Sequence, residues 1–378
     1  MVLGGSDAEL RLAFAAQLQG AFTAAWEAGE RTEDGEVSLR RLRPALRGRF
    51  LDDRLGFAFQ ANVVPGAAEL IDLWLDLRLV EGTRLRVGQT KVPFTRYRQL
   101  SFRDLLLVDW ADASPFFGGE RQLGALVAGT FERWGWSLGA FTGANRRAAH
   151  GIGVQRVYAE PLASPSTFGE GRGVERALHP ELVGYVSHGS AGFDARRPGA
   201  ASPAAGGGYL ATLSAAVDAR PEAGRDALVR LAPELWLRCG GTALIAVGYL
   251  AWVDRSGSEG PVFGLGGMNL ELAQRLGPLW ELAARYERVD VAPALRRDAR
   301  QRADALVAAA PPEAMDALGA TYADAGTLRS QQSVLVGVNA FAVGRSVRAQ
   351  LDAGWRRLER SAGRRDEARV RLQVQLAF

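Results

Sequence analysis

Four arginines alternate along one short stretch of the chain, Arg41, Arg43, Arg47 and Arg49, with a gap at Ala45. In a strand, alternate side chains share one face and stand ~6.6–7 Å apart. Arginine keeps its charge and binds phosphate or carboxylate through a two-pronged fork. The row therefore predicts a ladder along which an anion passes from one guanidinium group to the next.

The same alternation places charges of both signs on other polar strand faces. Among them are Arg84, Arg86, Arg285, Asp72 and Asp76. By the same parity the set extends to Arg11, Arg348, Arg356, Arg369, Arg371, Glu234, Glu281, Glu287 and Asp352. Two interpretations stay open: the arginines either make a wet interior positive, or pair with acids on neighbouring strands and brace the wall.

Residues 94–120 form a long segment between two predicted strands. It carries Arg96, Arg98 and Arg103, with Asp104 and Asp109 as counter-charges. The apolar stretch 105–108 would pack such a segment against an inner wall. The alternative is an external loop with solvated charges.

The residues that most enzymes and metal sites need are scarce. The chain has one cysteine and three histidines, His150, His179 and His188. We find no Gly-x-Ser-x-Gly motif and no phosphate-binding lysine loop, so we expect no catalytic residues, metal or cofactor. The formal charge of +4 is spread along the chain, which argues against nucleic acid as a partner.

A period of two dominates the 378-residue sequence and predicts an all-β fold. We expect about sixteen strands, many about 9–13 residues long, the length that crosses a membrane at a tilt. They lie near 8–22, 37–50, 54–63, 69–79, 83–92, 121–131, 135–142, 180–190, 207–217, 227–238, 243–253, 262–275, 279–290, 332–342, 346–357 and 368–378.

The polar strand faces favour a membrane barrel over a soluble sandwich, because they carry charges of both signs and bulky residues such as Trp74 and Trp236. An antiparallel transmembrane barrel would turn its apolar face to lipid and its charged face to a wet lumen. We therefore expect a single outer-membrane β-barrel domain over residues 1–378, with a soluble β protein as a weaker alternative.

Long and short connections mostly alternate along the chain. Longer loops are expected near 23–36, 94–120, 143–179, 291–331 and 358–367, with short turns between them. The links 64–68 and 191–206 break the alternation. This arrangement is typical of an outer-membrane barrel, in which 94–120 is the third loop and folds inward to narrow the lumen.

The two chain ends add to this interpretation. Phe378 closes a strand with an apolar residue at every second place, and such an end resembles the signal that barrel assembly machinery reads. The start, MVLGGSDAEL, has no basic region and no long apolar run, so we expect no signal peptide and interpret the sequence as a mature chain.

Several segments resemble the phosphate-selective porin O and P family. They are Leu39-Arg40-Arg41-Leu42-Arg43, the stretch 87–94 (VGQTKVPF), the stretch 279–290 (LWELAARYERVD) and Gly337-Val338-Asn339. The resemblance implies a sixteen-stranded, trimeric outer-membrane channel for anions such as phosphate. One departure is that lysine is nearly absent, with Lys91 alone.

We therefore predict an outer-membrane porin that passes small anionic solutes by passive diffusion through an arginine-lined lumen, in contact with outer-membrane lipid. Two alternatives remain open. Loops 143–179 and 291–331 would plug the barrel of a scaffold protein, and an outer-membrane barrel enzyme would need a Ser–His pair on the outer wall.

Overall fold

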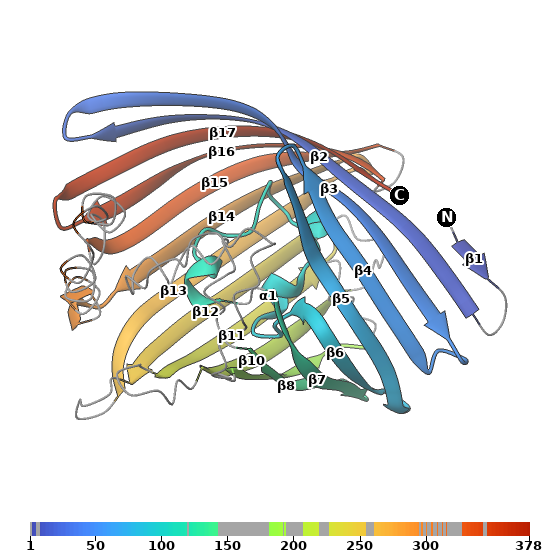
Figure 1. The fold of residues 1–378 in the computed structure, drawn as a ribbon. Coiled ribbons are helices and arrows are strands. Elements are labelled where there is room, and N and C mark those ends of the chain that lie inside the picture. Colours follow the sequence, from blue (N-terminus) through green and yellow to red (C-terminus); the bar gives the residue numbers. More distant parts are fainter. Residues whose placement is uncertain are drawn as a thin grey trace.

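Sixteen strands close into one antiparallel barrel in the computed structural model (Figure 1). The structure describes residues 2–4, 8–118, 121–142, 181–191, 193, 207–218, 227–254, 261–294, 327–342 and 346–378, with isolated positions between 296 and 315. The barrel strands are β2 (Ala8–Glu27), β3 (Glu30–Phe50), β4 (Leu55–Val64), β5 (Ala67–Val80), β6 (Thr83–Lys91), β7 (Arg121–Phe131), β8 (Trp134–Phe141), β9 (Glu181–Gly189), β10 (Gly208–Asp218), β11 (Ala227–Cys239), β12 (Thr242–Asp254), β13 (Pro261–Leu276), β14 (Trp280–Val291), β15 (Leu328–Ala342), β16 (Val347–Arg360) and β17 (Gly363–Ala377).

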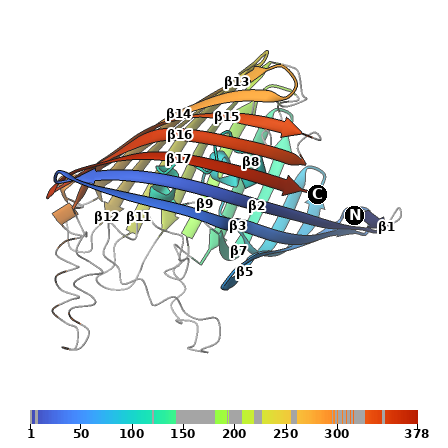
Figure 2. The ribbon, with the colours of Figure 1, turned by 90° about the horizontal axis from the view of Figure 1, so that it is seen from above.

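Each strand pairs with its sequence neighbours, and β17 closes the ring by pairing with β2. At the end of β17, Phe378 and Phe14 exchange two backbone hydrogen bonds of 2.9 and 3.0 Å. The short strand β1 (Val2–Gly4) then pairs with Glu9–Arg11 of β2, beyond the end of β17. Figure 2 shows the C-terminus beside β2 and β1 beyond it. The sixteen-stranded barrel predicted from the sequence is therefore confirmed.

The barrel has two distinct ends. The end that holds both termini, which we call the turn end, carries short connections such as 81–82, 132–133 and 240–241. The opposite end, which we call the loop end, carries long connections such as 92–120, 142–180 and 292–327.

Two of the predicted long loops are instead strand. Residues 23–36 continue β2 and β3 to a tight turn at Ala28 and Gly29, which both have positive φ, as favoured hairpin turns require. Residues 358–367 likewise continue β16 and β17 to a turn at 361–362. Alternation is imposed by contact with lipid. Where a hairpin extends past the lipid, both faces are polar and pairing continues without a period-two signal.

The strands are apolar outside and polar inside. Along β17, Leu372 is 53 % exposed and Val374 is 42 % exposed, whereas Gln373 and Gln375 are fully buried. In β14, Leu282 is exposed while its neighbour Glu281 is 1 % exposed. A soluble protein would bury the apolar residues, so this reversed pattern fits a barrel immersed in lipid.

The segment between β6 and β7 lies inside the barrel (Figure 1). It holds the short helices α1 (Arg96–Gln99), η1 (Phe102–Asp104) and η2 (Ser114–Phe117), and we call residues 92–118 the inner loop. The apolar side chains of the inner loop pack against inward-facing apolar residues of the strands, and together they form the buried core. No helix within the described ranges is long and apolar enough to span a membrane.

Several predicted features fall outside the described residues. These are the loop 143–179 with His150 and His179, the 194–206 part of link 191–206, and most of 291–331.

The orientation of the strands yields a direct test. Leu75 faces outward on β5 and is 59 % exposed, whereas its neighbour Trp74 faces inward. We expect Leu75→Arg to destabilise the folded barrel by about 2–4 kcal/mol, because it places a charge in lipid near mid-membrane. Trp74→Arg is the control and should cost less, since its charge meets the lumen. Urea unfolding in lipid vesicles measures both, and equal costs would contradict the assignment of faces.

Candidate functional site: the inner loop and the barrel wall

Carboxylates of the wall hold the inner loop by its backbone. Glu234 of β11 accepts hydrogen bonds from the N–H groups of Arg96 (2.7 Å) and Tyr97 (3.0 Å). Glu287 accepts one from Ala113 N at 2.8 Å, and Asp352 accepts one from Val108 N at 3.1 Å. Three acids that parity placed on the inner face therefore anchor the loop.

Wall side chains also donate to the carbonyl groups of the loop. These bonds come from strands spread around the ring: Arg230 to Phe117 O (2.8 Å), Arg285 to Asp109 O (2.7 Å), Asn339 to Leu106 O (2.9 Å) and Arg348 to Arg103 O (3.1 Å). A loop bonded through its backbone to this many strands is held in one position.

Arg285 lies beneath the inner loop. Its Nε is 2.7 Å from Glu271 Oε1, its Nη2 is 3.1 Å from the Tyr97 hydroxyl, and Tyr97 donates to Glu271 at 2.5 Å. The Arg285 side chain is only 1 % exposed. Parity placed Arg285 on the inward face. There the inner loop covers it and it pairs with Glu271 of the neighbouring strand, as the bracing interpretation describes.

Apolar contacts press the loop against the wall. Residues 105–108 are buried, and the Leu107 side chain lies so close to Gly337 that a Cβ there would sit 2.6 Å from it. The rings of Phe117 and Tyr249 stack with centroids 4.8 Å apart. A larger residue at position 337 would displace the Leu107 side chain and would also crowd the backbone oxygen of Leu351 in β16, 2.9 Å from the added Cβ.

Lys91 joins the two limbs of the inner loop. Its Nζ donates to the carbonyl oxygens of Arg98 (3.0 Å) and Leu100 (2.6 Å), just past α1. The same Nζ lies 5.0 Å from the ring centre of Trp110 on the returning limb, and Arg98 lies 5.1 Å from that ring. Lys91 thus fixes the positions of both Arg98 and Trp110.

Arg41 and Arg43, the two ladder arginines nearer the loop end, contact the inner loop. Arg41 donates to Gln17 at 2.7 Å and pairs with Asp109 of the loop at 3.2 Å. Arg43 lies 4.8 Å from the ring centre of Phe102 and donates to Asn62 at 3.4 Å. Both guanidinium groups therefore face the loop across the lumen side of β3.

A bulge adds a fifth arginine that parity missed. Gln17 pairs with Arg41 and Leu18 with Leu39, so Arg40 is an extra residue in β3, and its side chain pairs with Asp109 at 2.9 Å. Burial alone would raise the pKa of Asp109, but the nearby charges of Arg41 and Arg40 outweigh it and hold that pKa below its ordinary value.

Arg47 and Arg49, the other two ladder arginines, lie near the turn end, where Arg49 joins a network of ion pairs. Arg49 pairs with Asp53 at 3.4 Å, and Arg84 shares this carboxylate. Arg86 pairs with Asp76 at 3.2 Å. Arg47 is exposed. For Arg49, Arg84 and Arg86, the bracing interpretation therefore describes the contacts made.

The remaining predicted residues have separate positions. Asp72 pairs with Arg121 at 2.8 Å. On the loop, Arg96 donates to the Tyr185 hydroxyl at 2.8 Å, while Arg103 and Asp104 are partly exposed in η1.

Basic side chains gather on the side formed by β3, β6 and β7. The group consists of Arg40, Arg41, Arg43, Lys91, Arg98 and Arg121, and Asp72 and Asp109 lie among them. The strongest charged neighbours of Arg43 are Arg41 and Arg121, and those of Lys91 are Arg121 and Arg98. We call this group the basic cluster.

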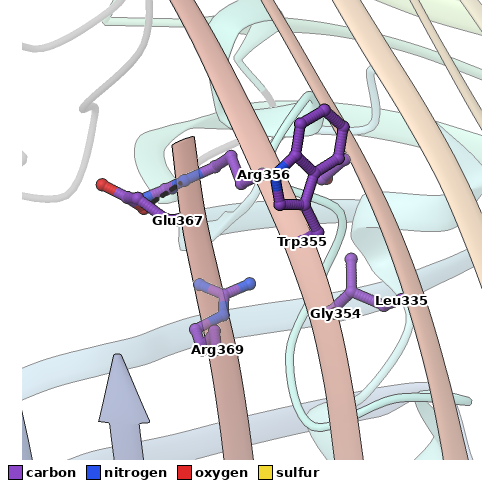
Figure 3. Close-up of a pocket in the computed structure, with 7 residues that line it drawn as sticks. Leu335, Gly354, Trp355, Arg356, Glu367 and Arg369 are labelled. Carbon is purple, nitrogen blue, oxygen red and sulfur yellow. Dashed lines mark hydrogen bonds and ion pairs between the residues drawn. The ribbon is translucent and has the colours of Figure 1, made fainter. Parts of the chain in front are cut away.

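The neighbouring stretch of wall formed by β16 and β17, which only β2 separates from β3, is more evenly balanced. Arg356 and Arg369 both pair with Asp112 of the loop, at 3.4 and 3.3 Å, and Figure 3 shows Arg356 directed at Glu367 with Arg369 beside them. Burial by itself would raise the pKa of Asp112. The positive charges of Arg369 and Arg356 have a larger, opposite effect, so the pKa of Asp112 lies below its ordinary value. Arginine and acid alternate here.

Within the described residues, no group of three or more His, Cys, Asp and Glu side chains is placed to hold a metal ion.

A closed barrel with an apolar exterior, a polar interior and an infolded loop defines a porin. The sequence matches the family model of phosphate-selective porin O and P over residues 16–224, more than half of the chain. The chain therefore belongs to this family of bacterial outer-membrane porins. No curated protein matches the sequence.

Solved structures with the same fold are porins and outer-membrane channels of low sequence identity. The anion-selective porin from Comamonas acidovorans has a TM-score of 0.61 and 12 % identity, with 98 % of this chain and 100 % of that chain covered. The outer membrane channel DcaP of Acinetobacter baumannii has a TM-score of 0.60 and 11 % identity, with 99 % of each chain covered. OmpF of Salmonella typhi, in complex with daunomycin, has a TM-score of 0.57 and 9 % identity, with both chains covered completely.

The contacts of Lys91 predict that it stabilises the open channel. Lys91→Met removes two charge-assisted bonds to the loop, each worth about 1.5–3 kcal/mol, so we expect frequent sub-conductance states in single-channel recordings. Lys91→Arg keeps a donor and should restore most of the steady current. Recordings of Lys91→Met as steady as those of the original protein would show that the loop does not depend on this residue.

Proposed function

We propose that this porin is an anion-selective channel whose narrowest part lies between the basic cluster and the inner loop. The observation that carries the proposal is the gathering of six basic side chains around two carboxylates, where the inner loop meets one part of the barrel wall. Rings and clusters of basic residues select anions in membrane pores.

The ladder supports a path with several weak sites. Arg41 and Arg43 face the loop, and Arg47 and Arg49 continue toward the turn end on the same strand face. Within each pair, a spacing of ~6.6–7 Å lets a small anion leave one guanidinium group as it reaches the next, and the gap at Ala45 doubles that step between the pairs. Conduction requires such binding, which is strong enough to admit the ion and weak enough to release it.

The solute class that fits is small anions, with phosphate-like ions among them, because an arginine fork matches the oxygens of phosphate and carboxylate. Transport then needs neither a catalytic group nor a cofactor. We further propose that the porin is a homotrimer, that it contacts outer-membrane lipid, and that Phe378 and its strand engage the barrel assembly machinery.

Neutralising the ladder tests the proposal. We expect the triple variant Arg41→Gln, Arg43→Gln, Arg47→Gln to lower the chloride-to-potassium permeability ratio by roughly tenfold, since each charge at a narrow point acts at short range. Reversal potentials in a salt gradient across a planar bilayer measure this ratio. Arg133→Gln, at an exposed turn between β7 and β8, is the control and should leave the ratio unchanged.

Three outcomes of that experiment are informative. An unchanged ratio in the triple variant would overturn the proposed role of the ladder. Absence of current from a correctly folded barrel would favour the plugged scaffold. Reduction of the chloride current by added inorganic phosphate in the original protein, and not in the variant, would support phosphate-like solutes.

Asp109 should limit the same selectivity, because its carboxylate neutralises part of the charge of Arg40 and Arg41. We expect Asp109→Asn to raise the chloride-to-potassium ratio by roughly two- to fivefold. The same bilayer recordings serve, with Asp290→Asn on the outer surface as the control. A fall in the ratio would mean that Asp109 acts mainly by holding the loop.

A further inference from the structure

Charge on the lipid-facing surface is confined to one sector near the loop end. In the described strands, the outward positions of the turn-end half carry no Asp, Glu, Lys or Arg; residues there include Leu77, Phe131, Leu276, Trp280 and Leu376. Outward charges appear instead at the loop ends of neighbouring strands: Arg288 and Asp290 in β14, Arg357 and Glu359 in β16, Arg364 and Asp366 in β17, and Arg31 and Glu33 in β3. We call these eight residues the outer charged patch.

Strand register makes the patch continuous. Arg288 pairs with Gln332, Gln332 with Arg357, and Arg357 with Asp366. Asp366 pairs with Trp26, which in turn pairs with Arg31 of β3. Neighbouring strands lie ~4.7–4.9 Å apart, so these side chains form one row across six strands.

Aromatic rings contact two of the arginines of the patch. Arg357 lies 4.5 Å from the ring centre of Trp355, and Arg31 lies 5.6 Å from that of Trp26. Tyr286 precedes Arg288 by two residues and so shares its outward face. Aromatic side chains mark the depth at which hydrocarbon gives way to headgroups, and arginine reaches from such a depth to the polar layer.

The charged side chains of the patch form ion pairs with one another, and several of them are still exposed at the surface. Arg288 makes two bonds to Asp290, at 2.7 and 2.8 Å, yet the two side chains are 47 % and 52 % exposed. Asp366 lies between Arg357, at 3.0 Å, and Arg364. Arg288, Arg364 and Arg31 are therefore each about half exposed while a neighbouring acid orients them.

This chemistry fits phosphate groups accompanied by a divalent cation. The guanidinium forks bind phosphate oxygens, and the exposed carboxylates of Asp290 and Asp366 can share an oxygen-seeking cation such as Mg²⁺ with the same phosphate. A contact with a second copy of the chain fits less well, because charged residues are depleted from the centres of protein interfaces.

We propose that the outer charged patch binds phosphorylated headgroups of membrane lipids at the loop end of the barrel. The loop end of such a barrel faces the outside, so the ligand belongs to the outer leaflet. This inference uses the membrane orientation only and is independent of the selectivity of the pore.

Lipid retention by the intact porin tests the proposal. The probes are a bisphosphorylated glycolipid and its dephosphorylated form, each in detergent with Mg²⁺, and native mass spectrometry counts the molecules bound. We expect the original protein to prefer the phosphorylated form. The double variant Arg288→Gln, Arg357→Gln should bind it roughly thirtyfold more weakly, since each arginine near an anionic headgroup contributes about 1 kcal/mol and about 1.4 kcal/mol is tenfold.

A charge-matched control separates the patch from overall charge. Arg54→Gln, Arg133→Gln removes two exposed arginines at the turn end and should retain the lipid in full. Heat-modifiable migration verifies that each variant is folded, and Arg288→Lys, Arg357→Lys should restore part of the binding. Single-channel conductance should not change in the patch variant, which keeps this test distinct from that of the pore.

Two results would overturn the proposal. One is equal retention of the phosphorylated lipid by the patch variant and the control. The other is loss of oligomers in the patch variant with lipid retention unchanged, which would make the patch a contact between protomers.

Discussion

Closure of the sheet is the constraint on which this structure depends. In hydrocarbon no water is present to bond an exposed N–H or C=O group, so a sheet must end on itself. Here β17 returns to β2, Phe378 bonds to Phe14, and β1 covers the part of β2 that β17 leaves unpaired. A ring of sixteen strands is wide enough to leave a lumen, and the inner loop and the basic cluster lie there.

The lumen in turn needs the inner loop, and the way the loop is held has a functional consequence. Many wall side chains bond to its backbone, as with Glu234, Glu287 and Arg348, and others pair with the side chains of Asp109 and Asp112. The backbone bonds do not depend on which loop side chain stands at those positions. Substitutions there therefore keep the bonds that fix the course of the loop.

The charges of the lumen are divided between two tasks. On the β16–β17 side, arginines and acids neutralise each other and anchor the loop, as Asp112 does with Arg356 and Arg369. On the β3–β6–β7 side, basic residues outnumber the acids that lie among them. Under the proposed function, the local excess of positive charge on the β3–β6–β7 wall is what attracts anions, because the field in a narrow passage is weakly screened.

The amino-acid sequence by itself determined the strands and their faces, because contact with lipid on one side and water on the other imposes a period of two. It also indicated that residues 94–120 fold inward, through the buried apolar stretch 105–108. Only the tertiary structure decided which inward arginines meet the lumen. Arg43 and Arg285 share one parity, yet Arg285 is buried beneath the loop whereas Arg43 is only partly buried against Phe102. A bulge that parity cannot detect directs Arg40 toward Asp109 of the loop. The physical reason is that alternation along a strand shows only which face of the sheet a side chain occupies. Whether the inner loop buries that side chain depends on residues that folding brings together from distant strands.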